Sequence, residues 1–314
     1  MRVIDSHTAG EPTRVILNGG PDLGKGSLAE RAVRLRAEYP EFYTSTIAEP
    51  RGHDAMVGAL IVPPTDPSCV TGVIYFNTVG NLGMCGHATI GLTVTLAHLG
   101  QIAPGQHRIE TPVGIVSVDL LDRNTVQVTN VESHRHRAGV TLNVDGLGEI
   151  TGDVAWGGNW FFIAPLDQLE IKPVNISKLT SVALEVRSAL KARQITGQGE
   201  AEIDHIEFTG PPDPGGSDGR NFVLCPGGAY DRSPCGTGLS AKIACLAEDG
   251  VLSPGELWTQ ESVIGSTYKA RYEEGANGGV IVTIEGQAFV TSDAQLYFDN
   301  ADQFRDGILT RRLE

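Results

Sequence analysis

Two cysteines lie 150 residues apart in closely similar surroundings. Cys85 opens the apolar run 86–99, Cys235 opens the run 236–248, and each is followed directly by glycine. Further matches at the same offset are Leu96-Ala97 with Leu246-Ala247, Gly100 with Gly250 and Pro104-Gly105 with Pro254-Gly255. A match at one fixed offset indicates an internal duplication. Two such thiols suit chemistry that needs one sulfur on each face of a substrate, although free cysteines are often inert core residues.

The placement of each cysteine at the start of an expected helix would make it reactive. Free backbone N–H groups and the positive end of the helix dipole stabilise a thiolate and can lower its pKa from roughly 8.5 toward neutrality. The same groups bind carboxylates. If both sulfurs faced one small amino acid, a thiolate could remove the α-proton and the opposite thiol could return a proton to the other face. This would invert the α-carbon without a cofactor, provided that preorganised donors, worth roughly 3 kcal/mol each, stabilised the carbanion.

Two further side chains could bind the substrate nitrogen. Asp231, four residues before Cys235, is the expected carboxylate partner of a charged amine, and His87, two residues after Cys85, could form a hydrogen bond with it. Asp231 could instead be a turn residue and His87 a hydrogen-bonded residue of the helix start, so both interpretations stay open. The remaining cysteines are expected to have no catalytic role: Cys69, Cys225 and Cys245.

Short strand-like runs, rich in β-branched or aromatic residues, dominate the elements that must position these groups. They are residues 13–17, 56–62, 70–76, 114–119, 125–130, 160–163, 222–224, 268–272 and 280–285. Residues 29–39 and 177–191 have helical spacing. The runs 86–99 and 236–248 are apolar nearly all round, which is typical of buried helices. We therefore expect each of these two helices to run through the middle of its own curled sheet.

Length and composition predict two ordinary domains. A chain of 314 residues is long enough for two cores, and the duplication places the first domain at 1–130, completed by 290–314, and the second at 131–289. The net charge of −14 argues against nucleic-acid or anionic-membrane partners. The chain has neither a long apolar stretch nor a signal-peptide pattern at its start, so a cytoplasmic monomer or homodimer acting on a small molecule is expected.

Cysteine usage argues against two other kinds of site. Five cysteines without a CxxC pair do not suggest a disulfide framework. Cys85 and His87 are too close in sequence for the usual metal-ligand spacing, and no second cluster completes a site. We therefore expect no metal.

The residues around both cysteines resemble the signature motifs of the proline racemase family. The motifs are Met84-Cys85-Gly86-His87 and Asp231-Arg232-Ser233-Pro234-Cys235-Gly236-Thr237-Gly238, and the opening residues 5–14 are also similar to the family's start. The likeness extends over nearly the whole chain, with one departure at Leu239, where the family usually has Thr. It implies an α/β (α+β) fold of two similar domains of the diaminopimelate-epimerase type, each a curled, mostly antiparallel sheet around a central helix, with an interdomain active site and no cofactor. It also implies that Cys85 and Cys235 are catalytic and that the substrate is bound by Gly86, His87, Asp231, Gly236 and Thr237.

Three activities compete within this family. Proline racemases and 4-hydroxyproline 2-epimerases keep both cysteines, whereas dehydratases of trans-3-hydroxy-L-proline usually replace one with Ser or Thr. This chain keeps both, and residues 76–80 and 152–162 resemble the bacterial hydroxyproline epimerases. We expect epimerisation of trans-4-hydroxy-L-proline to cis-4-hydroxy-D-proline. Proline racemase and the dehydratase, a lyase, are the alternatives, with a thiol oxidoreductase and a non-catalytic amino-acid-binding protein as more distant ones.

Overall fold

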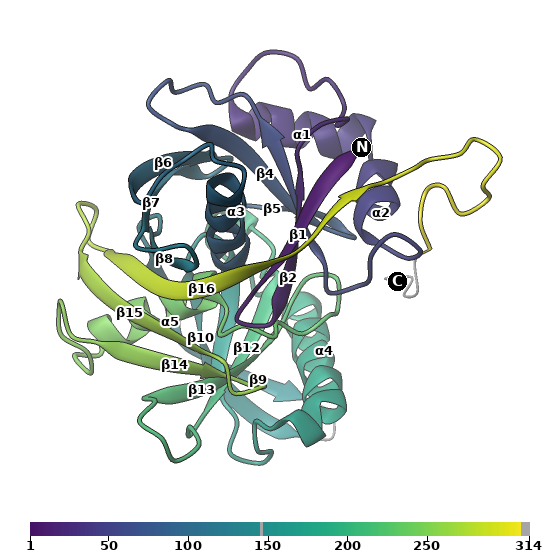
Figure 1. Cartoon of the computed structure of the whole chain (residues 1–314). Helices are drawn as coiled ribbons and strands as arrows, with labels where there is room; N and C mark the ends of the chain where they lie inside the picture. The colour runs from purple at the N-terminus through teal and green to yellow at the C-terminus, as the bar shows by residue number, and fades with distance from the viewer. Residues whose placement is uncertain (145–146, 309–314) are drawn as a thin grey trace. The chain divides into compact units, whose positions relative to one another are not determined.

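The computed structural model describes residues 1–144 and 147–308 and divides the chain into two compact units (Figure 1). Unit 1 contains Met1–Val128 and the C-terminal segment that begins at Gly286. Unit 2 contains Thr129–Glu285. The long strand β16 (Val280–Gln295) begins in unit 2 and continues into unit 1, so it contributes to both.

The sheet of unit 1 closes on itself. Its strands are β1 (Arg2–Thr8), β2 (Glu11–Ile16), β3 (Val57–Val62), β4 (Thr71–Asn77), β5 (Gly80–Leu82), β6 (Gly105–Thr111), β7 (Gly114–Leu120) and β8 (Thr125–Thr129). Strand β16 pairs with β1 on one side and with β8 on the other, which completes the ring β16-β1-β2-β3-β4-β6-β7-β8. Neighbours are antiparallel except for the pairs β2–β3 and β4–β6. Closure leaves this sheet with no free edge between β1 and β8.

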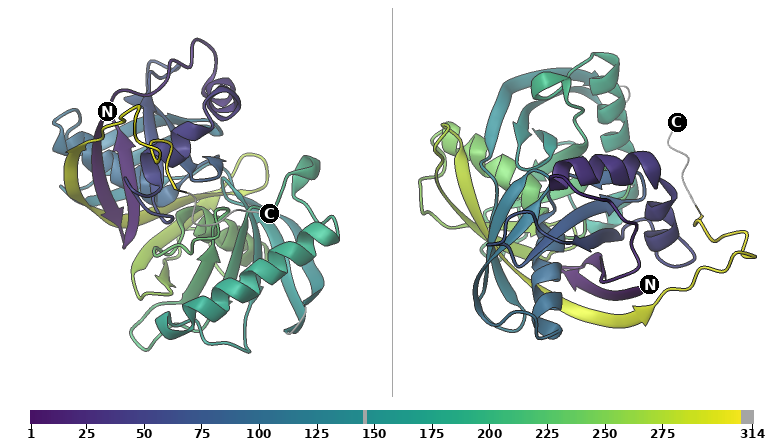
Figure 2. Two further views of the ribbon diagram at one scale, coloured as in Figure 1. Left: turned by 90° about the vertical axis from the view of Figure 1, so that its right-hand side faces the viewer. Right: turned by 90° about the horizontal axis from the view of Figure 1, so that it is seen from above.

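Helix α3 (Gly86–His98) lies inside this sheet, in contact with β1, β2, β3 and β7 (Figure 1). All of its residues from Gly86 to Leu96 are buried. Helices α1 (Leu28–Glu38) and α2 (Glu41–Ile47) pack on the outer face (Figure 2). Ser27 caps α1: its hydroxyl accepts from the N–H of Glu30, whose carboxylate accepts from the N–H of Ser27.

Unit 2 repeats this architecture. Its strands are β9 (His134–Val144), β10 (Gly148–Trp156), β11 (Trp160–Pro165), β12 (His205–Gly210), β13 (Gly219–Leu224), β14 (Trp258–Ser262) and β15 (Thr267–Glu274), in the order β16-β15-β14-β13-β12-β11-β10-β9. Its parallel pairs are β11–β12 and β13–β14. Helix α5 (Gly236–Glu248) contacts β9, β10, β11 and β15 on one face. Helix α4 (Ile176–Ala192), with the short turns η1 (Pro173–Asn175) and η2 (Gln198–Glu200), covers the other face (Figure 2).

Side-chain alternation along the strands explains why both faces are covered. On β11, Phe162 packs into the cluster formed with α4, whereas Phe161 and Ile163 pack against α5. Successive side chains of a strand point to opposite faces, and here both directions are apolar. A strand of this kind needs a helix on each face to remove its side chains from water.

The expected fold class is confirmed: each unit is a curled, mostly antiparallel sheet around a central helix. The four expected helices, 29–39, 86–99, 177–191 and 236–248, correspond to α1, α3, α4 and α5. Helix α2 was not expected, because its sequence Glu-Phe-Tyr-Thr-Ser-Thr-Ile is rich in residues that favour strands. Within the described part of the chain, no helix is long and apolar enough to span a membrane.

Candidate active site

Cys85 caps the buried helix of unit 1. It has an extended backbone, with φ −141°, and is 7% exposed. Its Sγ lies 3.3 Å from Nδ1 of His87. The Thr8 hydroxyl donates to the His87 carbonyl at 2.8 Å, which ties the start of α3 to β1. The helix start therefore places an imidazole nitrogen beside the thiol.

Cys235 caps the corresponding helix of unit 2 with a different backbone. Its φ of 58° lies in the left-handed region, which costs a non-glycine residue about 1–3 kcal/mol. Three hydrogen bonds hold this conformation: Asn221 Nδ2 to the Pro234 carbonyl at 2.8 Å, the Cys235 N–H to Ser233 Oγ at 3.1 Å, and the Leu239 N–H to the Cys235 carbonyl at 2.7 Å. The surrounding residues thus fix the direction of the Cys235 side chain.

Burial dominates the chemistry of the Cys235 thiol. Burial raises its pKa well above the ordinary value, and the negative charge of Asp231 acts in the same direction. The N–H of Gly238, in the first turn of α5, forms a hydrogen bond that lowers the pKa. The expectation that a helix N-terminus moves this pKa toward neutrality is wrong for Cys235, because the loss of solvation of the charged form outweighs the helix donors. Cys235 is therefore a thiol at neutral pH.

Asp231 and Thr237 flank Cys235 at close range. Asp231 Oδ1 accepts from the Ser233 N–H at 2.8 Å, which is the turn role considered for this residue. Thr237 Oγ1 lies 3.8 Å from Cys235 Sγ and accepts from Asn159 Nδ2 at 3.2 Å. Both side chains are buried. A role in substrate binding stays a prediction for each.

The candidate residues form two groups. Cys85, Gly86 and His87 lie together at the N-terminus of α3, in unit 1. The other group, at the N-terminus of α5 in unit 2, consists of Asp231, Cys235, Gly236 and Thr237. In both groups the cysteine immediately precedes the first residue of a helix of 13 residues. The duplication seen in the sequence is thus a duplication of the thiol and of the helix that follows it.

The sequence interpretation missed Glu207, on β12. Its side chain is completely buried, Asn221 Nδ2 donates to its Oε1 at 3.0 Å, and its Oε2 has no hydrogen-bond partner among the residues that the structure describes. Burial raises the pKa of this carboxyl to about 7, although the positive charge of Lys242 lowers it. The sequence signal for Glu207 is a single acidic residue between the apolar residues Ile206 and Phe208. It could not be used because residues 205–210 are not among the predicted strands.

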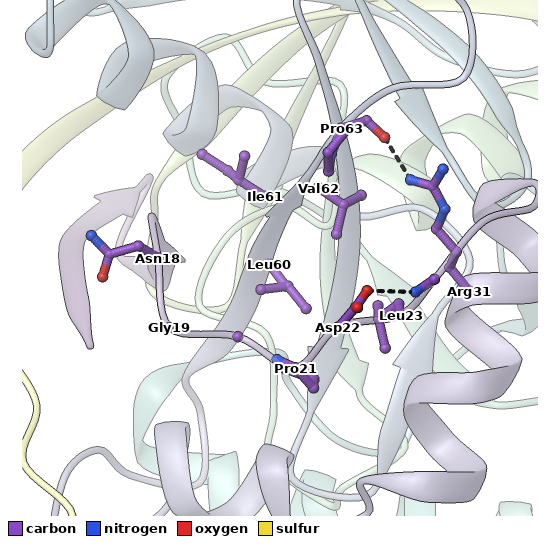
Figure 3. A pocket seen from close by; sticks show the side chains of 12 residues that line it. Asn18, Gly19, Pro21, Asp22, Leu23, Arg31, Leu60, Ile61, Val62 and Pro63 are labelled. Atoms are coloured by element: carbon purple, nitrogen blue, oxygen red, sulfur yellow. Dashed lines mark hydrogen bonds between the residues drawn. The ribbon is translucent and has the colours of Figure 1, made fainter.

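Unit 1 also contains a cavity of about 300 Å³ between the loop after β2, β3 and α1 (Figure 3). Asp22 Oδ1 accepts from the Gly24 N–H beside it, and Arg31 donates to the Pro63 carbonyl. None of the candidate residues lines this cavity. Over residues 1–144 and 147–308, no three His, Cys, Asp or Glu side chains are grouped so as to hold a metal ion.

Curated proteins of several bacteria are similar to this chain over its length. The chain is 64% identical over 308 residues to the 4-hydroxyproline 2-epimerase of Roseibium aggregatum, and this alignment covers 98% of this chain and 99% of that protein. It is 55% identical to the 4-hydroxyproline 2-epimerase of Xanthomonas campestris pv. campestris, with 98% of each chain covered.

Solved structures show the same fold. A hydroxyproline epimerase from Agrobacterium vitis, with trans-4-hydroxy-L-proline bound, has a TM-score of 0.90 at 26% identity, covering 98% of this chain and 94% of that one. A phenazine biosynthesis protein from Bacillus anthracis shares the fold at a TM-score of 0.61 and 14% identity, covering 95% and 99%. The family model described as proline racemase matches residues 3–309. The chain therefore belongs to the proline racemase family and is an isomerase of that family.

Proposed function

We propose that this protein epimerises trans-4-hydroxy-L-proline to cis-4-hydroxy-D-proline, with Cys85 and Cys235 as the acid–base pair. The observation that carries the proposal is that two cysteines, at one fixed offset, each cap a buried helix of 13 residues. The substrate assignment is supported by relatives at 55% and 64% identity that are named 4-hydroxyproline 2-epimerases.

The proposed reaction needs no redox step and no leaving group. One cysteine thiolate takes the α-proton and becomes a thiol, and the thiol of the other cysteine gives its proton to the opposite face of the α-carbon. The two sulfurs exchange protonation states in each turnover, so the next turnover in the same direction requires their protons to be reset by solvent. Since Cys235 is held as a thiol at neutral pH, Cys235 is the donor and Cys85 the base in one direction, and the roles are reversed in the other.

The substrate-binding roles follow from the chemistry of the helix starts. The first N–H groups of α3 and α5 have no partner within their helices and suit the substrate carboxylate. The Asp231 carboxylate suits the positively charged ring nitrogen. His87, beside Cys85, suits a hydrogen bond with the same nitrogen. Stabilising the developing charge on the carboxylate at roughly 3 kcal/mol per donor would make the α-proton accessible to a thiolate.

The test is incubation with trans-4-hydroxy-L-proline in D2O, followed by proton NMR and chiral separation at early times. We expect cis-4-hydroxy-D-proline carrying deuterium at the α-carbon, while the remaining substrate keeps its proton. That distribution distinguishes two bases from one, because a single base would return label to the substrate face as well.

Parallel incubations with other substrates separate the alternatives. Faster turnover of L-proline would make the protein a proline racemase. Consumption of trans-3-hydroxy-L-proline with loss of its hydroxyl and formation of a cyclic imine would make it a dehydratase. Inertness toward trans-4-hydroxy-L-proline would overturn the proposal.

A further inference from the structure

We propose that Glu207 is a positioning residue for Cys235, whose carboxyl group sets how readily the Cys235 sulfur can carry a negative charge. The inference rests on the proposed function only in taking Cys235 as one of the reacting groups. The groups that act on Cys235 in this inference all lie within unit 2.

A hydrogen-bonded connection joins the carboxyl to the segment that carries the thiol. Asn221 Nδ2 donates both to Glu207 Oε1, at 3.0 Å, and to the carbonyl of Pro234, at 2.8 Å. Pro234 immediately precedes Cys235. The same amide therefore fixes one oxygen of the carboxyl and the backbone that holds Cys235 in its left-handed conformation.

The second carboxyl oxygen lies close to the sulfur, across Gly238. A methyl group on Gly238 would clash with Glu207 Oε2 and would lie 3.2 Å from Cys235 Sγ. Both groups thus border the space that a side chain at position 238 would fill. Glu207 Oε2 is fully buried and, within residues 1–144 and 147–308, has no hydrogen-bond partner. A charge on it is therefore poorly screened and acts strongly on a neighbouring thiolate.

Several ionisable groups influence this carboxyl. Lys242, on α5, and His205, on β12, lower the pKa of Glu207 when charged, whereas Asp231 raises it. The Lys242 ammonium donates to Gln260 Oε1 at 3.1 Å. With burial as the largest cause, the pKa of Glu207 lies at about 7. The negative charge of Glu207 is in turn one cause of the raised pKa of Cys235, after burial, Asp231 and Cys225.

The carboxyl belongs to only one of the two copies. Ile163 pairs with Glu207 across β11 and β12, and Thr13 pairs with Val57 across β2 and β3, so that both pairs share the 150-residue offset. Val57 therefore occupies the position in unit 1 that corresponds to Glu207 in unit 2. Cys85 instead has an imidazole nitrogen 3.3 Å from its sulfur. We infer that the two half-sites are differentiated, with Glu207 favouring the thiol form of Cys235.

The test measures the alkylation rate of Cys235 by iodoacetamide, a neutral probe, from pH 5.5 to 9. The thiolate displaces iodide and forms a sulfur–carbon bond, so the rate reports the thiolate fraction. Trypsin releases residues 233–242, in which Cys235 is the only cysteine, for mass spectrometry. An isolated thiol below its pKa gains tenfold in rate per pH unit. For the wild type we expect a shallow region near pH 7, where the Glu207 carboxyl ionises.

Glu207→Gln mimics the protonated carboxyl with the same shape. We expect equal rates for this variant and wild type at pH 5.5, and a rate about tenfold above wild type at pH 8.5, as for a pKa shift of one unit. The shallow region should disappear. Glu207→Asp, which keeps the acid, should retain it. Glu273→Gln, an exposed carboxyl-to-amide change on β15, should follow the wild type throughout.

A general loosening of the site would change the two rates by the same factor at both pH values, and that result would overturn the proposal. A wild-type alkylation rate that rises tenfold per pH unit without a break across pH 7 would also overturn the proposal. This second result comes from the wild type alone, so it does not depend on the folding of any variant. The measurement uses no hydroxyproline. Failure of the epimerase assay therefore leaves this test intact. If the protein were an active epimerase but its alkylation rate showed no shallow region near pH 7, only the role of Glu207 would be refuted.

Discussion

At Cys235, burial and helix position act in opposite directions on one sulfur, and burial is the stronger influence. A thiol whose pKa lies far above ambient pH is seldom present as the thiolate, so it rarely acts as a base. The same thiol is a competent proton donor. The proposed reaction needs one donor and one base at a time. An environment that keeps Cys235 protonated is therefore useful as long as the other sulfur is ionised.

Single Cys→Ser substitutions should abolish inversion. A serine hydroxyl is far less acidic than a thiol, so it can neither be ionised as the base nor give up a proton readily. Loss of one general acid or base costs about 10²–10⁴-fold. We expect Cys85→Ser and Cys235→Ser each to retain less than about 1% of the wild-type kcat, measured by chiral chromatography of hydroxyproline.

The matched control is Cys69→Ser, which makes the same change at a buried cysteine in a loop of unit 1. It should keep wild-type activity. Substantial inversion by either helix-capping variant would show that one cysteine is dispensable and that the two-base mechanism is incorrect.

At the scale of the elements, the turn between β10 and β11 packs closely against the start of α5. A methyl group on Gly157 would clash with the Thr237 carbonyl and would lie 2.7 Å from the Ala241 nitrogen. Both are backbone atoms of a buried helix and cannot move independently. Overpacking of this kind costs about 1–3 kcal/mol. We expect Gly157→Ala to lower the free energy of unfolding of unit 2 by this amount in urea titrations followed by tryptophan fluorescence.

Gly215→Ala is the control for that change, because a methyl group there meets no atom of the described part of the chain within 4 Å. Its urea midpoint should equal that of the wild type. Equal midpoints for both variants would mean that the β10–β11 turn can retreat from α5 without cost.

Strands β1 and β2 are joined by an ion pair between buried Arg14 and partly buried Asp5, and a second, exposed pair elsewhere in unit 1 has the same geometry. Asp5 and Arg14 face one another in register, with Nη2 and Oδ2 2.7 Å apart, and Arg14 also donates to the carbonyl of Thr46, at the end of α2. Removing one partner of a buried pair leaves an uncompensated charge, which costs about 3–5 kcal/mol. Asp5→Asn should therefore markedly lower the thermal midpoint of unit 1.

Asp293→Asn removes the matched partner of Arg2, at the same 2.7 Å distance but with both side chains more than 40% exposed. Solvent screens this pair, so its loss should not measurably change the midpoint. Scanning calorimetry compares the two variants. Equal effects would show that burial does not control the strength of these pairs.

The sequence was sufficient to predict the repeated helices because their signal is local. Cysteine and glycine at a fixed offset mark both starts, and the long apolar runs that follow determine burial. Helix α2 had no such signal, since Phe42, Tyr43 and Ile47 form a helix only by packing on the unit 1 core. Glu207 was missed for a related reason. Its strand, β12, is absent from the predicted strand-like runs, and the burial of its carboxyl depends on α5 and β13, which come later in the chain.

For the whole molecule, the buried carboxyl makes stability depend on pH in a predictable direction. Glu207 has an ordinary pKa of 4.5, and the folded value is about 7. Between these values the folded state binds more protons than the unfolded state, so the free energy of unfolding falls as pH rises through this window. The stabilisation is complete below about pH 4.5 and is lost above about pH 7. A shift of this size corresponds to a change on the order of 3 kcal/mol.

Tryptophan fluorescence can assign that change to unit 2, because Trp156, Trp160 and Trp258 all lie there and they are the only three in the chain. We expect urea titrations to give Glu207→Gln the same free energy of unfolding as wild type at pH 4, below both pKa values, and a higher one at pH 8, where only the wild type holds a buried charge. Glu273→Gln should match wild type at both values. A variant that is equally destabilised at pH 4 and pH 8 would mean that Glu207 is ionised throughout, and that the positive charge of Lys242 outweighs the effect of burial on this carboxyl.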